Sequence, residues 1–394
     1  MAKFLYVNGT SIFDYSNGAC NSLLNIFERI STSGHKVFVV SACSSTSFSS
    51  YTFSKRIWEN NKLKSKNIIY RFIQNGVFHS LVKTHNWDRN GLTSFEQETI
   101  YREAISIIEN NDINFIVGWG NLLLEEAIFK EAKYRKIKLL FYLVNKFYKG
   151  TNTFILKNSD AVITDSESTK KLYSNELNCD CFVLPKFIKK PKEFYPEERL
   201  LSKNCLFVNP ALEKGLESFL LISKYLQHTY PKIRLICRDA KNLLNSEIKK
   251  INKELKDIPN NVLLKSGTHN KDELYKDIKV LLLLSINHES GSSLIYEAYS
   301  RGIPVIAFDV GGNSQFIGKF KENLFVKPKI NKNSNLNPYL ENWDPTPISE
   351  RISTVINNQN EYVEYSKKIK TYYDQLLLED KSINSFNKII NKLT

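Results

Sequence analysis

The chain has 394 residues, of which 42% are hydrophobic and 24% charged, and its formal net charge is +14. This length favours two domains over one core. The longest apolar stretches, Leu139–Val144 and Val280–Leu284, are strand-sized, which excludes a membrane-spanning helix. The first residues lack the apolar core of a signal peptide, and six scattered cysteines are too few for a disulfide framework.

The excess of 55 basic over 41 acidic residues indicates one of three anionic partners: nucleic acid, a membrane surface or a polyanionic substrate. The sequence has no zinc-finger, helix-turn-helix or RNA-binding signature, so nucleic acid is the weakest of the three. A composition rich in lysine and asparagine would also produce the charge without any partner. We therefore expect no nucleic-acid partner and keep an anionic membrane surface as an alternative.

The N-terminal half alternates strand-like and helix-like runs, which is typical of a mainly parallel sheet flanked by helices. Apolar residues at helical spacing predict a helix over Cys20–Ser33, which Gly34 ends. Two further helices are expected over Glu96–Glu109 and Asn121–Arg135, whereas the serine-rich stretch Ser44–Phe53 predicts a loop. The expected strands are Lys3–Val7, Lys36–Val40, Asn67–Ile73, Phe115–Val117, Lys138–Leu143 and Ala161–Thr164.

The prolines and charges of Pro185–Arg199 predict the connection between two domains. A second alternation follows, and the pattern is helical from Pro347 on. We expect an N-terminal Rossmann-like domain over 1–184, a linker over 185–203, a C-terminal domain over 204–370, and a helical segment over 371–394 that packs back toward the first domain. The expected strands of the second domain are Cys205–Val208, Arg234–Cys237, Asn261–Lys265, Val280–Leu284 and Pro304–Phe308.

The segment Val280–Gly312 carries the strongest functional signal, with the pattern strand, loop, helix, strand and glycine-rich loop. Its first strand is apolar throughout, as expected of a strand buried on both faces. The following loop, Ser285–Gly291, then lies at the carboxyl edge of the sheet, where open α/β sheets bind ligands. A helix capped by serine would begin there and present its first amides to a phosphate. These amides belong to Ser292, Ser293 and Leu294.

Two carboxylates, Glu289 and Glu297, flank this expected phosphate site. A carboxylate accepts two hydrogen bonds side by side, which suits the vicinal diol of a ribose or a sugar ring. Either residue alone is more simply interpreted as a solvated surface carboxylate. Because the pair frames the site within a strand–helix–strand segment, we interpret both as ligands of a nucleotide sugar.

The spacing E-x7-E, whose second glutamate opens E-A-x-x-x-G-x-P-V-I-A-x-D-V-G-G, resembles the donor site of the family-four retaining glycosyltransferases. These enzymes have the GT-B fold, so the resemblance implies an α/β protein of two facing Rossmann-like domains with a cleft between them. It also implies that Glu289 contacts the transferred sugar and that Glu297 contacts the ribose.

A second segment, Phe207–Gly215, resembles the loop after the first strand of the family's donor domain, which ends in Lys-Gly. The resemblance implies that Lys214 meets the donor phosphates, where a lysine can neutralise a leaving diphosphate without a metal. The family usually has Gly-Arg where this chain has Asn209 and Pro210, so one expected cation is missing. Arg238 could supply it, or could equally be a structural arginine.

The loop Asn8–Ala19, which contains Gly9 and Gly18, resembles the family's loop that faces the diphosphate and the acceptor. It lacks the glycine-rich dinucleotide fingerprint, which counts against a dehydrogenase. We therefore count Gly18 among the expected nucleotide-binding residues, together with Glu297, Asn209, Arg238 and the three amides near Ser292.

The resemblance implies a retaining glycosyltransferase that moves a sugar from a UDP- or GDP-linked donor to a hydroxyl of a glycan, a lipid-linked glycan or a protein. No D-x-D triad is present, so we expect no metal and no cofactor besides the donor. Two alternatives remain: another nucleotide-sugar enzyme, such as an epimerase or a phosphorylase-like protein, and a degenerate subunit that only assists a partner. We expect the protein in the cytoplasm, either free or peripheral on the inner membrane face.

Overall fold

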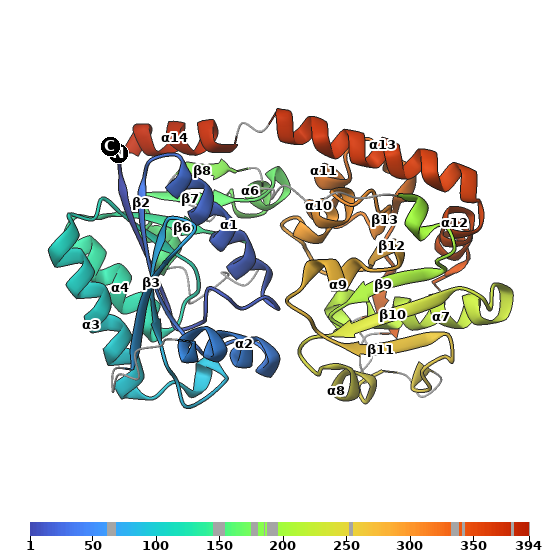
Figure 1. The fold of residues 1–394 in the computed structure, drawn as a ribbon, viewed down its shortest axis with the longest axis horizontal. Helices are drawn as coiled ribbons and strands as arrows, with labels where there is room; N and C mark the ends of the chain where they lie inside the picture. The colour runs from blue at the N-terminus through green and yellow to red at the C-terminus, as the bar shows by residue number, and fades with distance from the viewer. Residues whose placement is uncertain are drawn as a thin grey trace. The chain divides into compact units, whose positions relative to one another are not determined.

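The computed structural model describes residues 1–60, 68–144, 154–174, 180–184, 186, 196–251, 255–331, 339–340, 343–379 and 382–393. The chain divides into two compact units. Unit 1 comprises Met1–Phe187 and Asp380–Thr394, and unit 2 comprises Ile188–Glu379. Each unit is a twisted sheet with helices packed against its faces (Figure 1).

Unit 1 contains an eight-stranded sheet in the order β3-β4-β2-β1-β5-β6-β7-β8, parallel except for the antiparallel pair β3 and β4. Its strands are β1 Lys3–Asn8, β2 Lys36–Ala42, β3 Ile69–Gln74, β4 Val77–Val82, β5 Phe115–Gly118, β6 Lys138–Tyr142, β7 Ala161–Thr164 and β8 Asp180–Val183. Its helices are α1 Gly18–Thr32, α2 Phe48–Glu59, α3 Ser94–Asn111, α4 Leu123–Tyr134, α5 Phe154–Asn158, α6 Glu167–Tyr173 and α14 Ser382–Leu393.

The central strand β1 explains why unit 1 folds as layers. Phe4 and Tyr6 point into one apolar cluster, whereas Leu5 and Val7 point into the cluster on the opposite face. A strand covered on both faces must be apolar at every position, as this one is. The C-terminal helix α14 belongs to the first cluster, where the ring of Phe386 lies 5.5 Å from that of Phe4.

Unit 2 contains a six-stranded parallel sheet in the order β11-β10-β9-β12-β13-β14. Its strands are β9 Asn204–Val208, β10 Arg234–Asp239, β11 Val262–Ser266, β12 Ile278–Leu283, β13 Val305–Phe308 and β14 Leu324–Phe325, with a separate pair β15 Ile330–Asn331 and β16 Tyr339–Leu340. Its helices are α7 Leu216–Thr229, α8 Leu244–Ile248, α9 Lys271–Tyr275, α10 Ser293–Tyr299, α11 Asn313–Ile317, α12 Thr346–Asn357 and α13 Gln359–Leu378.

In each sheet, successive strands are first added on one side of a central strand and later on its other side, so the strand order reverses at that strand. In unit 1 the chain leaves β1 toward β2 and later returns to the other side of β1 with β5. In unit 2 the corresponding neighbours are β9 and β12. Loops on either side of such a point diverge and leave a crevice at the carboxyl ends of the strands, which is where open α/β sheets bind ligands.

The expected α/β class with two Rossmann-like sheets is confirmed, but one local prediction is wrong. Ser44–Phe53 was expected to be a loop, whereas α2 begins at Phe48 and Ser47 caps it by accepting a hydrogen bond from the amide of Ser50. Serine favours both loops and helix N-caps, so composition alone did not separate the two. Most of the expected linker, residues 185 and 187–195, lies outside the described residues.

No described helix combines the length and the apolar content needed to cross a bilayer.

A buried ion pair between Lys186 and Asp165 holds the end of the first chain segment of unit 1, Met1–Phe187. The ammonium of Lys186 lies 2.6 Å from Asp165 Oδ2 and 3.0 Å from Ser22 Oγ, and Tyr142 donates to Asp165 Oδ1 at 2.7 Å. Only 9% of the Lys186 side chain and 4% of the Asp165 side chain are exposed. Because these charges are desolvated, removing one leaves the other without compensation.

We predict that Lys186→Met lowers the free energy of unfolding by about 3 kcal/mol, since it strands the buried Asp165 carboxylate. The control is Lys138→Met, which removes an ion pair to Asp160 whose side chains are 47% and 33% exposed. Its expected cost is below about 1 kcal/mol. Urea unfolding followed by circular dichroism measures both, and equal costs would contradict the prediction.

Candidate functional site in unit 2

Three loops of unit 2 meet at the point where the strand order reverses. They follow β9, β12 and β13, and two backbone hydrogen bonds join them. The amide of Ile286 donates to the carbonyl of Glu213 at 3.1 Å, and the amide of Gly312 donates to the carbonyl of Glu289 at 2.7 Å. The loops therefore form one connected backbone layer at the carboxyl edge of the sheet.

Two glycines permit this close approach. Gly215 has φ +86°, and a Cβ there would overlap the carbonyl of Leu284. Gly311 has φ +61°, and a Cβ there would overlap the carbonyl of Glu289. Both backbone conformations favour glycine, and neither site has room for a side chain. The glycines of the Lys-Gly and Gly-Gly motifs therefore make the close backbone contacts that position the loops around Lys214 and Glu289.

These loops bring Lys214 and Glu289 into direct contact. The ammonium of Lys214 forms an ion pair with Glu289 Oε1, which also accepts a hydrogen bond from Ser285 Oγ at 2.6 Å. The Lys214 side chain is 38% exposed and that of Glu289 is 20% exposed. The pair is thus held in place on the protein side while remaining open to a ligand. Sequence reasoning identified both charged residues but missed Ser285.

The short helix α10, Ser293–Tyr299, follows Glu289 along the chain. Its N-cap is Ser292, whose side chain makes no capping hydrogen bond, and its first residues are Ser293 and Leu294. The first amides of a helix have no partner within the helix, so they are donors for whatever lies at that end. Gly291 precedes the cap at φ +134° and packs against the ring of Phe316, where a Cβ would not fit.

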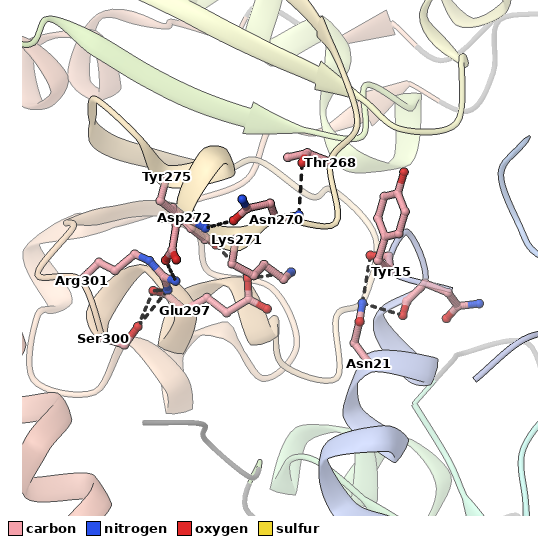
Figure 2. Close-up of polar contacts among 11 residues, drawn as sticks. Tyr15, Asn21, Thr268, Asn270, Lys271, Asp272, Tyr275, Glu297, Ser300 and Arg301 are labelled. Atoms are coloured by element: carbon pink, nitrogen blue, oxygen red, sulfur yellow. Dashed lines mark hydrogen bonds and ion pairs between the residues drawn. The ribbon is translucent and has the colours of Figure 1, made fainter. Parts of the chain in front are cut away.

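Glu297, on the second turn of α10, is bound by two side chains of α9 (Figure 2). Its Oε2 atom lies 2.9 Å from the ammonium of Lys271 and accepts a hydrogen bond from the Tyr275 hydroxyl at 3.1 Å. Burial, and then the nearby Glu297 charge, raise the pKa of Tyr275 well above its usual value, so the hydroxyl stays a donor. No motif in the sequence indicated Lys271 or Tyr275.

A further set of contacts ties α9 to α10. Arg301 forms an ion pair with Asp272 at 3.0 Å, donates to the carbonyl of Glu297 at 3.1 Å and lies over the Tyr275 ring (Figure 2). Since Arg301 contacts both helices, it fixes the distance between the Glu297 carboxylate and its partners on α9.

Asn209 and Arg238 occupy the ends of β9 and β10. Asn209 has φ +59°, a conformation that asparagine tolerates better than most residues, and its amide donates to the carbonyl of Arg238 at 2.9 Å. The buried guanidinium of Arg238 binds the Ser266 carbonyl at 2.9 Å and Glu273 at 3.2 Å. Among the described residues, its hydrogen bonds and ion pairs do not include Lys214 or Glu289, so it does not join their charge pair.

Gly18 belongs to unit 1, where it is the first residue of α1 and is capped by the Asn17 side chain. The side-chain amide of Asn21, on α1, donates to the carbonyl of Tyr15 at 3.0 Å and so ties the preceding loop to the helix (Figure 2). Within the described parts of the chain, no group of three or more His, Cys, Asp or Glu residues could hold a metal ion. Metal independence remains a prediction.

We predict that Gly311→Ala lowers the free energy of unfolding by about 3 kcal/mol, because the new Cβ strains a left-handed backbone and displaces Glu289. The control is Gly18→Ala, where a Cβ would meet no described atom within 4 Å. Its expected effect is within about 0.5 kcal/mol. Chemical denaturation measures both variants, and an unchanged Gly311→Ala protein would refute the close approach.

Residues 202–372 match the family model described as "Glycosyl transferases group 1", whereas a search of curated proteins finds no significant match. The similar solved structures include Anabaena HepE in complex with UDP and glucose, which is 13% identical, with coverage of 100% of this chain and 99% of that one, and a TM-score of 0.68.

Two further structures share the fold. A mutant of S. aureus TarM in complex with fondaparinux, alpha-GlcNAc-glycerol and UDP is 12% identical, covers 100% of both chains and has a TM-score of 0.64. A glycosyltransferase from Rickettsia africae is 14% identical, covers 100% of this chain and 97% of that one, and has a TM-score of 0.63. The chain thus has the GT-B fold, and its segment 202–372 is similar to the glycosyl transferases group 1 family.

Proposed function

We propose that this protein is a retaining glycosyltransferase that moves a sugar from a UDP- or GDP-linked donor to a hydroxyl acceptor. The observation that carries the proposal is the pairing of Lys214 with Glu289 where the strand order of unit 2 reverses. A cation and a carboxylate there suit the two ends of a sugar diphosphate. The UDP and glucose bound to HepE support a nucleotide-sugar donor.

Each residue of the site has a distinct proposed role. Glu289 accepts hydrogen bonds from hydroxyls of the transferred sugar, and Lys214 stabilises the charge that develops on the leaving diphosphate. The amides of Ser293 and Leu294 bind a phosphate oxygen. Glu297 binds the ribose hydroxyls through the oxygen that Lys271 and Tyr275 leave open, since both of their contacts go to Oε2.

The proposed reaction is a substitution on the front face of the sugar. The acceptor hydroxyl oxygen forms the new bond to the anomeric carbon while the bond to the diphosphate oxygen breaks. The electron pair stays with the diphosphate, which accepts the hydroxyl proton. The protein then positions the two substrates and stabilises negative charge, and it needs no nucleophile of its own.

The second candidate function is a degenerate subunit that supports a catalytic partner. The observation that favours it is Asn209-Pro210, which stands where a cation is usual, while Arg238 binds Ser266 and Glu273 instead. Calorimetric titration with a panel of UDP- and GDP-sugars separates the two candidates, because a degenerate subunit should bind none of them.

The acceptor is proposed to be a glycan, a lipid-linked glycan or a protein, reached in the cytoplasm or at its membrane face. The net charge of +14 supports an anionic acceptor or leaflet.

We predict that Lys214→Ala lowers kcat about 100-fold with little change in donor KM, because the lysine acts on charge that develops as the bond breaks. The control is Lys370→Ala, which removes a helix-surface ion pair to Asp374 in the same unit. Steady-state kinetics of nucleotide release gives both constants. A Lys214→Ala enzyme with full turnover would show that the lysine does not serve the leaving group.

We predict that Glu297→Gln raises donor KM about tenfold, because it loses charged hydrogen bonds to the ribose. The control is Glu350→Gln, since Glu350 also accepts hydrogen bonds from tyrosines, Tyr225 at 2.9 Å and Tyr230 at 2.7 Å. A donor KM that rises equally in both variants would indicate loss of stability rather than loss of a ligand.

We predict that transfer continues at the same rate after exhaustive EDTA treatment, because Lys214 and the helix amides carry the charge stabilisation that a divalent ion would otherwise supply. The assay compares treated enzyme with and without added Mg²⁺ or Mn²⁺. Activity that depends on the added ion would overturn this part of the mechanism.

A further inference from the structure

The strand-order reversal of unit 1 carries a second cluster of polar residues. Asn8, the last residue of β1, donates to the carbonyl of Trp119 at 2.7 Å, and the amide of Thr10 donates back to Asn8 Oδ1 at 2.7 Å. These contacts join the loops after the neighbouring strands β1 and β5. Unit 1 therefore has its own connected loop layer at the edge where α/β sheets bind ligands.

A buried ion pair between Arg89 and Glu125 is hydrogen-bonded to this loop layer. Glu125 is fully buried, and its Oε1 atom accepts hydrogen bonds from the amide of Gly9 and from Arg89 Nη2, each at 3.1 Å. Its Oε2 atom accepts from the amide of Leu122 at 3.1 Å. Burial raises the pKa of Glu125, and the nearby Arg89 opposes this shift. With both oxygens occupied, the carboxylate acts as a structural anchor.

Three donor atoms of the same cluster have no acceptor among the described residues. Thr10 Oγ1, Trp119 Nε1 and Arg89 Nε are buried and have no hydrogen-bond partner in the part of the chain that the structure describes. Thr10 is 0% exposed and Trp119 is 6% exposed. Buried polar atoms are nearly always paired in proteins, so three unpaired donors on loops and side chains that contact one another indicate a missing acceptor.

The Arg89 guanidinium is placed to bind that acceptor. Among the described residues, its hydrogen bonds involve Nη2 alone, although a guanidinium has five N–H donors. Its carbon lies 5.9 Å from the centre of the Trp119 ring. Gly120, at φ +94°, has no side chain beside the guanidinium. The Arg89 side chain is 15% exposed, so part of it reaches solvent.

We propose that Arg89, Trp119 and Thr10 form an anion site in unit 1 that binds a phosphate or carboxylate group. A cation with unused N–H groups, an indole N–H and a hydroxyl are all donors, and both oxygens of the Glu125 carboxylate that holds the cation are already occupied. Such a set matches a group that has several acceptor oxygens and a negative charge. The identification of this group as part of the sugar acceptor rests on the proposed function, whereas anion binding itself does not.

Hydrogen exchange with inorganic phosphate tests the site in the full-length chain, without a nucleotide sugar. We expect phosphate to slow amide exchange in residues 8–12 and 118–122. Exchange in residues 209–215 and 284–292 is followed separately, so that phosphate bound near Lys214 is not mistaken for this site. The midpoint of a phosphate titration gives the affinity of each region.

The main variant is Arg89→Met combined with Glu125→Gln, which removes the cation without stranding the buried carboxylate. We expect it to weaken phosphate binding at residues 8–12 about tenfold. The matched control is Arg71→Met with Glu103→Gln, which removes a bidentate pair between β3 and α3. We expect the control to change this affinity less than about twofold.

Thr10→Val keeps the test decisive if the double variant fails to fold. It retains the shape of the side chain and removes a hydroxyl that has no partner among the described residues, so it should fold and still weaken phosphate binding severalfold. Unchanged phosphate affinity in Thr10→Val and in the double variant, or absence of protection in the wild type, would overturn the site and leave an ordered water as the missing acceptor. Phosphate binding that depends on Arg89 in a protein without transferase activity would retain the site and reject the proposed function.

Discussion

The candidate site of unit 2 depends on how closely three backbone segments approach one another. Gly215 lies against the carbonyl of Leu284, and Gly311 lies against the carbonyl of Glu289. A side chain at either position would push the loops apart. Because the loops hold the charged groups, this spacing sets the distance between Lys214 and Glu289, and a shift of about 1 Å at such a site is enough to lower a rate strongly.

Both carboxylates of this site are held by a lysine. Glu289 is paired with Lys214, and Glu297 is paired with Lys271. Each lysine comes from a different loop or helix than its carboxylate, so the pairs also tie the elements together. All four side chains are between 20% and 38% exposed. Surface pairs of this kind are weak, so a bound ligand can replace part of the pairing at small cost.

Sequence reasoning recovered the features that are set by continuous patterns. The strands buried on both faces are unbroken apolar runs, and Lys214 and Glu289 follow two such strands that are neighbours in the sheet. Features set by tertiary contacts were not predictable. Lys271 and Tyr275 lie on α9, a helix of five residues, which is too short to show a helical period. The direction of Arg238 is decided by Ser266 and Glu273, far along the chain.

The ion pairs at the two strand-order reversals differ in burial. The pair of Lys214 and Glu289 is partly exposed, as expected for groups that exchange partners when a ligand binds. In unit 1 the Glu125 side chain is fully buried and that of Arg89 is only 15% exposed. Burying two charges is costly, and a buried pair contributes little net stability. Among the residues that the structure describes, the guanidinium is held through Nη2 alone. Anion binding by its other nitrogens, as proposed, accounts for a pair that stability alone does not explain.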